Sequence, residues 1–417
     1  MKKKFYLSIL FFLVILLAIS FLNRSVEFKK LKRNKIFPIL TAIKNNEMLK
    51  YINLGYKNNF LPNTSYGDLK FNIIKLNLDS TDYKVGYGKR KSYYKPFYIE
   101  EFNNFIYIFQ ANGKIHKFSK DKLNFKKKID PIEIESYFNN LKNIYILDTL
   151  RVKKSIFVSF KSIFENCEKF NILKFDIENF SKFEVIYKPQ ECASIIQAGS
   201  MELFNFNNKE GILFTISGPH YYLKNEKFES QNNESIFGKI LFINFSDLKI
   251  NLISKGFRNH QGLVVSKRCI LSTDHGPEGG DEINNIKVGG NYGWPIASYG
   301  EPYEKKELAN YKFPKFLKSH EENGFIEPVY TFLPSIAISK IIELKNNFSS
   351  IWQDNFLVAS LNARSLFRIK LSKNCERMIY SEKIYIGQRI RDILLSKDEK
   401  NIFLALEDEG AIGLLKQ

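Results

Sequence analysis

The chain has 417 residues, 44% of them hydrophobic, and a formal net charge of +19 from 63 basic and 44 acidic residues. Its lysines are scattered and do not gather on one helix or in an arginine-rich arm, so we expect no nucleic-acid partner. The four cysteines show no C-x-x-C spacing, which argues against a zinc ribbon or a thioredoxin-like site.

Residues 1–25 are predicted to be a membrane anchor or a signal sequence. A short lysine run precedes an apolar stretch from Phe5 to Leu22, which is long enough to cross a bilayer. The length of the stretch favours an uncleaved transmembrane helix, and cleavage after Ser20 is the alternative. The basic residues place the N-terminus in the cytoplasm. We therefore expect a membrane-anchored protein of the cell envelope whose body faces the periplasm or the exterior.

Residues 26–93 are interpreted as a linker and lead-in segment, which can include a closing strand. From residue 94 onward the chain repeats an alternating apolar strand, a polar turn and another strand. Six groups of strands are expected: Phe97 to Ile108 with Lys114 to Phe118; Ile144 to Leu150 with Ile156 to Phe160 and Ile172 to Ile177; Met201 to Phe206 with Ile212 to Ile216 and Lys239 to Phe245; Gly262 to Thr273; Ile336 to Leu344 with Asn355 to Ser360 and Leu366 to Leu371; Arg391 to Leu395 with Ile402 to Leu406. Such groups are typical of β-propeller blades, and a sandwich or barrel would show the same alternation.

The segment from Thr273 to Pro295 contains six glycines and two prolines, so turns are expected there instead of a helix or a central strand. The Gly276-Pro277 pair is followed by the carboxylates of Glu278, Asp281 and Glu282. Carboxylates and backbone carbonyls are the ligands that Ca²⁺ prefers. An acidic surface turn that closes a hairpin is the alternative interpretation.

Several motifs follow one another in the C-terminal half of the chain. They are R-N-x-Q-G-L from Arg258, H-G-P-x-G-G-D-E-I-N-x-I from His275, N-Y-G-W-P from Asn291, P-S-I-A from Pro334 and R-I-R-D from Arg389. In this order they resemble the glucose/sorbosone dehydrogenase family, which includes PQQ-dependent soluble aldose sugar dehydrogenases. The resemblance is strong from about residue 251 to the C-terminus and weaker over residues 94–247.

The resemblance implies an all-β fold, with a six-bladed β-propeller over residues 94–417 preceded by the N-terminal transmembrane helix. It also implies PQQ and Ca²⁺ as cofactors. In the family, a base removes the proton of the sugar's anomeric hydroxyl while a hydride passes to PQQ, whose carbonyl is polarised by Ca²⁺ and an arginine. A sugar or glycan is therefore the expected substrate.

The resemblance assigns residues to the cofactor site. Arg258 and Asn259 match residues that contact the quinone and take part in catalysis. Arg389 and Arg391 match the arginines that pair with the PQQ carboxylates, a task that suits the guanidinium fork. Tyr303 occupies a position near the cofactor in relatives.

The resemblance also assigns two Ca²⁺ sites. The carbonyls of Gly276 and Pro277 match the ligands of the catalytic Ca²⁺. Glu282 with Tyr292 is similar to a second, structural Ca²⁺ site.

The family's general-base histidine is absent from this chain. Its position is taken by Ile196, or by Gln197 if the register slips by one, and neither side chain accepts a proton at neutral pH. On the same half, Gly218 stands where the family has an aspartate and Asn143 where it has a cofactor-contacting glutamine. His260 is expected to face away from its neighbours on an extended strand.

Two functional hypotheses follow. The first is a PQQ- and calcium-dependent sugar dehydrogenase with weak or altered activity. The second is a non-catalytic, calcium-stabilised propeller that binds a glycan or protein partner at the cell envelope. Of the cysteines, Cys167 and Cys192 could form a disulfide, whereas Cys269 is interpreted as a core thiol.

Overall fold

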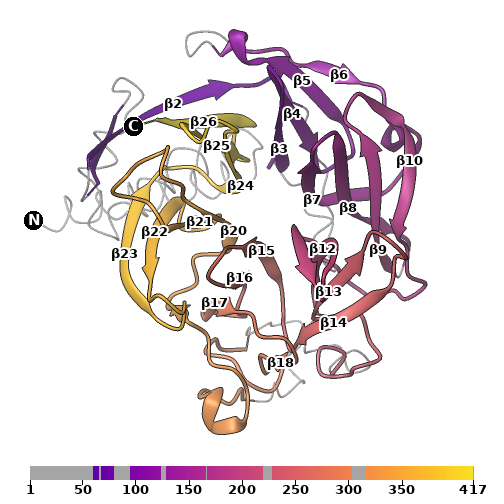
Figure 1. Cartoon of the computed structure of the whole chain (residues 1–417), viewed down its shortest axis with the longest axis vertical. Coiled ribbons are helices and arrows are strands. Elements are labelled where there is room, and N and C mark those ends of the chain that lie inside the picture. Colours follow the sequence, from indigo (N-terminus) through magenta and orange to yellow (C-terminus); the bar gives the residue numbers. More distant parts are fainter. Residues whose placement is uncertain are drawn as a thin grey trace, which may run out of the picture. The chain divides into compact units, whose positions relative to one another are not determined.

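The computed structural model describes residues 60–64, 67–78, 94–123, 128–165, 167–218, 228–302 and 315–416. The expected N-terminal transmembrane helix over residues 1–25 lies outside these ranges, as does Tyr303. Within them, no helix is long and apolar enough to cross a membrane. Six β-sheets, in which nearly all strand pairs are antiparallel, are arranged in a ring, which confirms the prediction of an all-β, six-bladed propeller (Figure 1).

Each blade is a sheet whose strands follow one another from the centre outward. Blade 1 has β3 (Phe97–Phe102), β4 (Phe105–Gln110), β5 (Ile115–Ser119) and β6 (Ile132–Ile134); blade 2 has β7 (Ile144–Val152), β8 (Ser155–Ile163), β9 (Glu168–Asp176) and β10 (Asn179–Tyr187); blade 3 has β11 (Met201–Phe206), β12 (Lys209–Ile216), β13 (Lys239–Asn244) and β14 (Ile250–Lys255), with β18 (Gly290–Asn291) at its edge.

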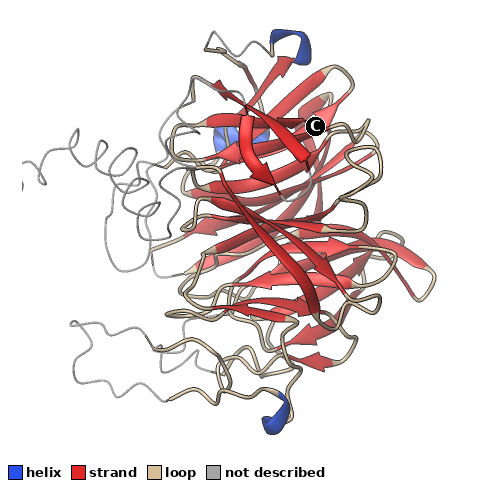
Figure 2. Ribbon diagram, turned by 90° about the vertical axis from the view of Figure 1, so that its left-hand side faces the viewer, coloured by secondary structure: helices blue, strands red, loops and turns tan. Residues whose placement is uncertain are grey.

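The second half of the ring repeats this arrangement. Blade 4 has β15 (His260–Val265), β16 (Ile270–Asp274), β17 (Asp281–Asn285) and β19 (Tyr330–Phe332); blade 5 has β20 (Ile338–Glu343), β21 (Phe356–Ser360), β22 (Ser365–Leu371) and β23 (Met378–Tyr385); blade 6 has β24 (Ile390–Leu395), β25 (Asn401–Leu406) and β26 (Ala411–Lys416). Short 3₁₀ helices lie between strands at Lys120–Lys122, Tyr137–Asn140 and Glu321–Asn323. Helices are blue and strands are red in the side view of Figure 2.

Blade 6 is completed from the other end of the chain. Strand β2 (Gly67–Lys75) pairs antiparallel with β26, and β1 (Phe60–Thr64) pairs with β2. The compact unit accordingly begins at Asn59, so the last part of the expected lead-in segment belongs to the propeller. This pairing closes the ring because it joins an N-terminal strand to the C-terminal blade.

Apolar side chains from neighbouring blades fill the spaces between the sheets. Phe170 of β9 and Phe214 of β12 stack with ring centroids 5.9 Å apart, in a cluster shared by blades 2 and 3. Similar clusters join blades 1 and 2, 3 and 4, 4 and 5, and 6 and 1, for example Phe332 of β19 with Phe367 of β22. Many strands are buried along most of their length, because each sheet packs between two neighbouring blades.

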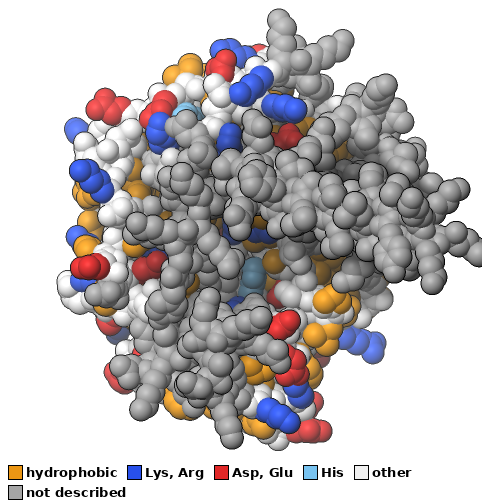
Figure 3. Space-filling view, turned by 180° about the vertical axis from the view of Figure 1, so that it is seen from behind, with side chains coloured by type: hydrophobic (Ala, Val, Ile, Leu, Met, Phe, Trp, Pro, Cys, Tyr) orange, Lys and Arg blue, Asp and Glu red, His pale blue; other side chains and the backbone are white. Residues whose placement is uncertain are grey.

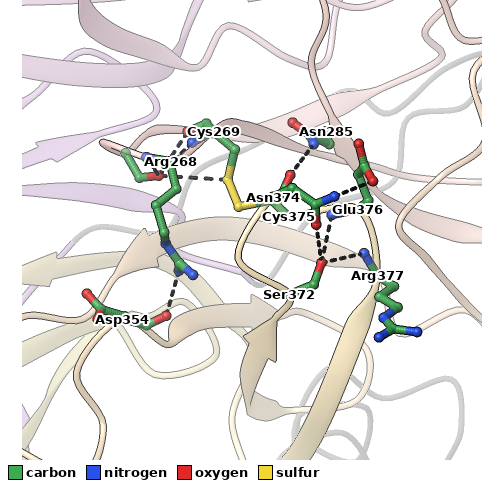
Figure 4. The surroundings of a disulfide bond; sticks show 10 residues. Arg268, Cys269, Asn285, Asp354, Ser372, Asn374, Cys375, Glu376 and Arg377 are labelled. Carbon is green, nitrogen blue, oxygen red and sulfur yellow. Dashed lines mark hydrogen bonds between the residues drawn. A yellow bond between two sulfur atoms is a disulfide. The ribbon is translucent and has the colours of Figure 1, made fainter.

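Two disulfides strengthen the ring. Cys167 is bonded to Cys192, the pairing that the sequence left open. Cys269 is bonded to Cys375, so its interpretation as a core thiol was wrong. This second bridge joins the β15–β16 turn of blade 4 to the β22–β23 turn of blade 5 (Figure 4). The sequence could not pair these cysteines because 106 residues separate them.

Candidate cofactor site

The H-G-P segment is organised by a single carboxylate. Asp281 Oδ1 accepts hydrogen bonds from Gly276 N at 3.1 Å and from Ser335 Oγ at 2.6 Å. Its Oδ2 accepts from Ile336 N at 2.9 Å and from Ile338 N at 3.1 Å. Asp281 thus joins the H-G-P loop to the P-S-I-A segment, so the two motifs together form one hydrogen-bonded structure.

The prediction that the whole segment from Thr273 to Pro295 forms turns was wrong in one part. Residues Asp281–Asn285 form β17, which pairs with both β16 and β19 inside blade 4. The glycines lie on either side of this strand, and the strand residues themselves are all buried. The glycine count of the segment concealed a five-residue strand between two turns.

A second carboxylate fixes the R-N motif. Asp274 Oδ2 accepts a hydrogen bond from Arg258 N at 2.9 Å, and Oδ1 accepts one from Asn259 N at 2.5 Å. Burial raises the pKa of Asp274 to about 6, although these two N–H groups lower it. Since Asp274 ends β16, it sets the backbone of Arg258 and Asn259 immediately before β15.

The Arg258 side chain lies in a small cavity. Its Nη1 donates to the carbonyl of His275 at 2.9 Å, and its guanidinium carbon lies 5.5 Å from the centroid of the Trp294 ring. The cavity is lined by Gly256, Arg258, Asp274, His275, Gly276, Glu282, Tyr292, Trp294, Ala297 and Ser298. The structure therefore brings the R-N, H-G-P and N-Y-G-W-P motifs to one place.

The arginines of R-I-R-D share one carboxylate. Arg389 Nε donates to Glu407 Oε1 at 2.6 Å, and Arg391 Nε donates to Glu407 Oε2 at 2.9 Å. Burial alone would raise the pKa of Glu407, but Arg391 and Arg389 lower it to about 2. Two cations with one anion leave a net positive charge, and the terminal nitrogens of Arg389 donate to none of the described residues.

The arginine pair is connected to the R-N motif. Arg391 Nη1 donates to Gln261 Oε1 at 2.9 Å, and Gln261 Nε2 donates to Asn259 Oδ1 at 3.3 Å. Near the centre of the face opposite to Figure 1, Lys or Arg side chains are visible close to a histidine (Figure 3). The geometry is that of a partly buried anion site, because guanidinium groups with unused donors bind planar carboxylates.

Glu282 fits the role of a cation ligand better than any other acid of the segment. It is 8% exposed, accepts a hydrogen bond from Asn284 Nδ2 at 3.2 Å and lies 3.7 Å from His320 Nε2. Burial raises the pKa of Glu282 well above its ordinary value, and the neighbouring Asp274 raises it further. A cation beside Glu282 would relieve this cost.

The other expected ligands contribute backbone oxygens. Tyr292 OH donates to the Asn285 carbonyl at 2.6 Å and accepts from Lys287 N at 2.9 Å, so only its main chain is available. No described residue donates a hydrogen bond to the carbonyl of Gly276 or Pro277. The described ranges contain no group of three or more His, Cys, Asp or Glu side chains suited to a metal. An ion here would depend on carbonyl oxygens, which Ca²⁺ accepts.

The position of the missing base lies on a firmly held loop. Ile196 is fully buried in the cluster between blades 2 and 3, whereas Gln197 is partly exposed. Ile196 N donates to Glu168 Oε2 at 2.5 Å, and the Ile196 carbonyl accepts from Lys161 Nζ at 2.7 Å. Of the two candidates, only Gln197 therefore has side-chain surface open to solvent.

The other two altered positions have different surroundings. A Cβ at Gly218 would lie 2.2 Å from Ser230 Oγ and 2.6 Å from the Phe257 carbonyl, so no aspartate fits there without rearrangement. Asn143 is exposed and has a left-handed backbone with φ of 56°. Neither position presents a catalytic group.

Neither nearby histidine replaces the base. His260 is fully buried, its Nε2 lies 3.0 Å from the Ile216 carbonyl, and its ring stacks on Phe257. Burial lowers the pKa of His260 to about 3. Burial also lowers the pKa of His275 to about 4, and its Nε2 is enclosed. Both rings are neutral at physiological pH; His260 has no exposed surface, whereas His275 is partly exposed and lines the cavity.

Sequence reasoning missed the residues that support the site. Glu407 holds the arginine pair, Asp274 holds the R-N backbone, and Trp294 lines the cavity. Glu407 could have been noticed as an acid at the end of an apolar strand, Asn401–Leu406. Its partners, however, are 16 and 18 residues away, and no local pattern indicates them.

Two proteins that are similar in sequence are named as sugar dehydrogenases. The chain is 29% identical over 224 residues to the aldose sugar dehydrogenase YliI of Escherichia coli, which covers 50% of this chain and 57% of that protein. It is 24% identical over 265 residues to the quinoprotein glucose dehydrogenase B of Acinetobacter calcoaceticus, covering 49% and 55%. The alignments thus span about half the length of these relatives.

Solved structures show the same fold. The apo form of the soluble aldose sugar dehydrogenase from Escherichia coli has a TM-score of 0.61 at 18% identity, over 84% of this chain and 99% of that one. The PQQ-bound aldose sugar dehydrogenase from Streptomyces coelicolor has a TM-score of 0.54 at 16% identity, over 83% and 98%. The family model described as Glucose / Sorbosone dehydrogenase matches residues 106–415. The chain belongs to the glucose/sorbosone dehydrogenase family.

Proposed function

We propose that this protein binds PQQ and Ca²⁺ and acts as a sugar dehydrogenase with low turnover. The arginine pair held by Glu407 is the observation that carries the proposal, because its unused donors suit a planar polycarboxylate. The two arginines are partly exposed, whereas the acid between them is buried, so their outer nitrogens remain accessible to a ligand. Family membership and the PQQ-bound relative support the same cofactor.

Each part of the site has a task in this proposal. Bound PQQ supplies the acceptor for two electrons from the sugar. Arg389 and Arg391 bind its carboxylates, and Arg258 with Asn259 orients it and offers hydrogen bonds to its oxygens. Asp274 and the Arg391–Gln261–Asn259 chain keep these donors in place. Orientation and fixed donors account for much of the rate of such a site.

Ca²⁺ would be held on the H-G-P side of the pocket. The carbonyls of Gly276 and Pro277 would face one ion, and Glu282 with the Tyr292 carbonyl a second. A divalent ion at the first position would act as a Lewis acid toward the cofactor. At the second it would neutralise a carboxylate that burial and Asp274 otherwise make costly to ionise.

Slow turnover follows from the side chains at the base position. Ile196 has no proton-accepting atom, and the Gln197 amide is not basic at neutral pH. A sugar hydroxyl in this pocket would lose its proton to water, without the roughly 10² to 10⁴-fold benefit that a positioned base supplies.

We further propose that the propeller works in the cell envelope on the outer side of the membrane. The apolar stretch from Phe5 to Leu22 would anchor or export it. The two disulfides suit an oxidising compartment. Fractionation of cells that express the tagged chain, with and without alkaline washing, would separate an anchored protein from a released one.

A second candidate is a non-catalytic propeller that binds a glycan or protein partner. The observations that favour it are the core position of Ile196 and the absence of space beside Gly218 for an aspartate. In that case the arginine pair and the H-G-P loop would only stabilise the blades.

Titration of the full-length chain with PQQ, with and without Ca²⁺, would separate the two candidates. Binding is followed through the cofactor's absorbance and then by reduction of a dye with a panel of aldoses. Calcium-dependent binding with slow dye reduction is expected. Binding without any turnover would indicate a cofactor-retaining protein that has lost catalysis, and no binding would leave the non-catalytic propeller.

A further inference from the structure

A buried ion pair crosses the central channel of the propeller. Lys340 lies on β20 of blade 5 and Asp148 on β7 of blade 2, two blades on opposite sides of the ring (Figure 1). Lys340 Nζ donates to Oδ1 and Oδ2 of Asp148 at 2.9 and 2.8 Å, although 192 residues separate the two. Both residues are buried. Because blades 2 and 5 are not neighbours in the ring, this pair is a direct connection across it.

Lys340 keeps its charge in this position. Burial alone would lower its pKa, but Asp148, Asp392 and Glu202 raise it above the ordinary value. These carboxylates come from three different blades, and the ammonium group lies among them. An interior ion pair of this kind is costly to break by removing one partner, because the other charge stays buried.

The Asp148 end of the pair holds the loop of the missing base. Asp148 Oδ2 also accepts hydrogen bonds from Ser200 Oγ at 3.1 Å and from Met201 N at 3.0 Å. Met201 begins β11, and the loop with Ile196 and Gln197 comes directly before it. Asp148 therefore fixes the end of the segment that faces the reacting side of the pocket.

The Lys340 end holds the cofactor-binding motifs. Ser339 Oγ donates to the carbonyl of Ile390 at 2.7 Å, and Ile390 is the residue between Arg389 and Arg391. Ile338 N donates to Asp281, the carboxylate that organises the H-G-P loop. The first residues of β20 thus support both the arginine pair and the H-G-P loop.

We propose that Lys340 and Asp148 are positioning residues that set the spacing between the two sides of the cofactor pocket. One side is the loop of residues 196–201, and the other comprises the arginine pair and the H-G-P loop. The proposal rests on the proposed function, because the pocket it adjusts is the one assigned to PQQ. Lys340 and Asp148 act through the backbone they hold and do not touch the cofactor.

The first test needs no ligand. Amide hydrogen exchange is compared between the full-length wild-type chain, Lys340→Met and Lys340→Arg. The matched control is Lys154→Met, which removes a surface ion pair with Glu178 of 2.9 Å. We expect Lys340→Met to exchange about tenfold faster at residues 196–202 and 335–341, with β9 unchanged and Lys340→Arg close to wild type. Uniform acceleration across all blades, or no change at these two segments, would overturn the proposal.

A second variant covers the case in which Lys340→Met does not fold. The double variant Lys340→Met with Asp148→Asn removes both charges, while the amide oxygen can still accept from Ser200 and Met201. It is expected to fold, because no uncompensated charge remains. It should still show the faster exchange at residues 335–341, since the connection is gone. Wild-type exchange in this double variant would overturn the proposal.

The second test uses PQQ as the probe. We expect the Kd for PQQ to rise about tenfold in Lys340→Met, because misplacement of a pocket wall by a fraction of an ångström weakens every contact. Lys340→Arg should bind nearly as wild type and Lys154→Met unchanged. Equal affinity of Lys340→Met and wild type would overturn the positioning role. If the wild-type chain itself does not bind PQQ, the proposed function fails, and the exchange comparison still decides whether the ion pair acts as a connection.

Discussion

The two halves of the propeller differ in the groups that they bring to the cofactor pocket. Blades 4 and 6 carry Arg258, Asn259, Arg389 and Arg391, each held by a buried carboxylate. Blades 2 and 3 present the partly exposed Gln197 and the filled space beside Gly218. Under the proposed function, cofactor binding would be located in the first half, and the position expected for the base would lie in the second.

The altered half is supported as firmly as the other. The base loop is held by the Lys161–Glu168 ion pair of 2.8 Å, by the hydrogen bonds of Ile196 and by the Cys167–Cys192 disulfide. Ile196 contributes only backbone atoms to these hydrogen bonds, so the support of the loop does not depend on which side chain stands at that position.

Installing a base should give the largest effect. Gln197→His places an imidazole at the partly exposed position, and kcat for aldose oxidation with PQQ and Ca²⁺ should rise by about 10²-fold or more. Ile196→His is the matched control, because a histidine in the blade core should destabilise the fold without a gain in activity. Dye-reduction kinetics measure both. A wild-type kcat equal to that of Gln197→His would show that proton transfer is not what this half lacks.

Removing one arginine should abolish tight cofactor binding. Arg391→Met loses charge-assisted hydrogen bonds worth about 1.5 to 3 kcal/mol each, so the Kd for PQQ should rise by about 10²-fold. Isothermal titration gives the value. Arg151→Met, at an arginine that donates to the Lys153 carbonyl on the β7–β8 turn, is the control and should bind as wild type. Unchanged affinity in Arg391→Met would remove the assignment of the arginine pair to the cofactor.

The two disulfides should stabilise the two halves unequally. Replacing both cysteines of a bridge by serine should lower the free energy of unfolding by about 2 to 4 kcal/mol. The loss should be larger for Cys269–Cys375, with a separation of 106 residues, than for Cys167–Cys192, with 25, because the longer loop gains more entropy on unfolding. Guanidinium denaturation compares the two pairs. The reverse order would mean that native-state contacts, rather than loop length, set these energies.

The smallest predicted effect is the contribution of Glu202 to the pH dependence of stability. Burial raises the pKa of Glu202 from its ordinary 4.5 to about 7. Between these values the folded protein keeps a proton that the unfolded chain releases, so this group's contribution to stability is full below about pH 4.5 and is lost as pH rises through 7. Relative to Glu202→Gln, the wild type should therefore be more stable at pH 5 than at pH 8. Denaturation at both pH values tests this, with the exposed Glu210→Gln as control, and a pH-independent difference would contradict it.

Most of the fold could be predicted from the sequence, and the reason lies in where strands are buried. Inner and middle strands such as β7, β8 and β9 are recognisable because they are rich in apolar residues and are buried on both faces between neighbouring blades. The outer strands were missed. Most residues of β10 are exposed, so its sequence shows little alternation between apolar and polar residues. The lead-in segment was interpreted as able to include a closing strand, but its pairing with β26 could not be predicted because the two strands lie at opposite ends of the chain.

The site was predicted as a set of motifs but not as a geometry. The order of the motifs identified Arg258 and the arginine pair, which occupy one region of the structure. The acids that hold them, Asp274 and Glu407, could not be recognised because a supporting carboxylate has no fixed spacing from the residue it holds. The ion pair of Lys340 and Asp148 could not be predicted from the sequence either, because only closure of the ring brings these opposite blades together.

The proposed function depends most directly on whether the side of the pocket with the arginine pair and the H-G-P loop binds PQQ. Equilibrium titration of the wild-type chain with PQQ, at several Ca²⁺ concentrations, measures this without requiring turnover. We predict saturable binding of PQQ that tightens with Ca²⁺ and is lost in Arg391→Met. Absence of saturable binding at any Ca²⁺ concentration would contradict this prediction, because the arginine pair would then have a structural role alone.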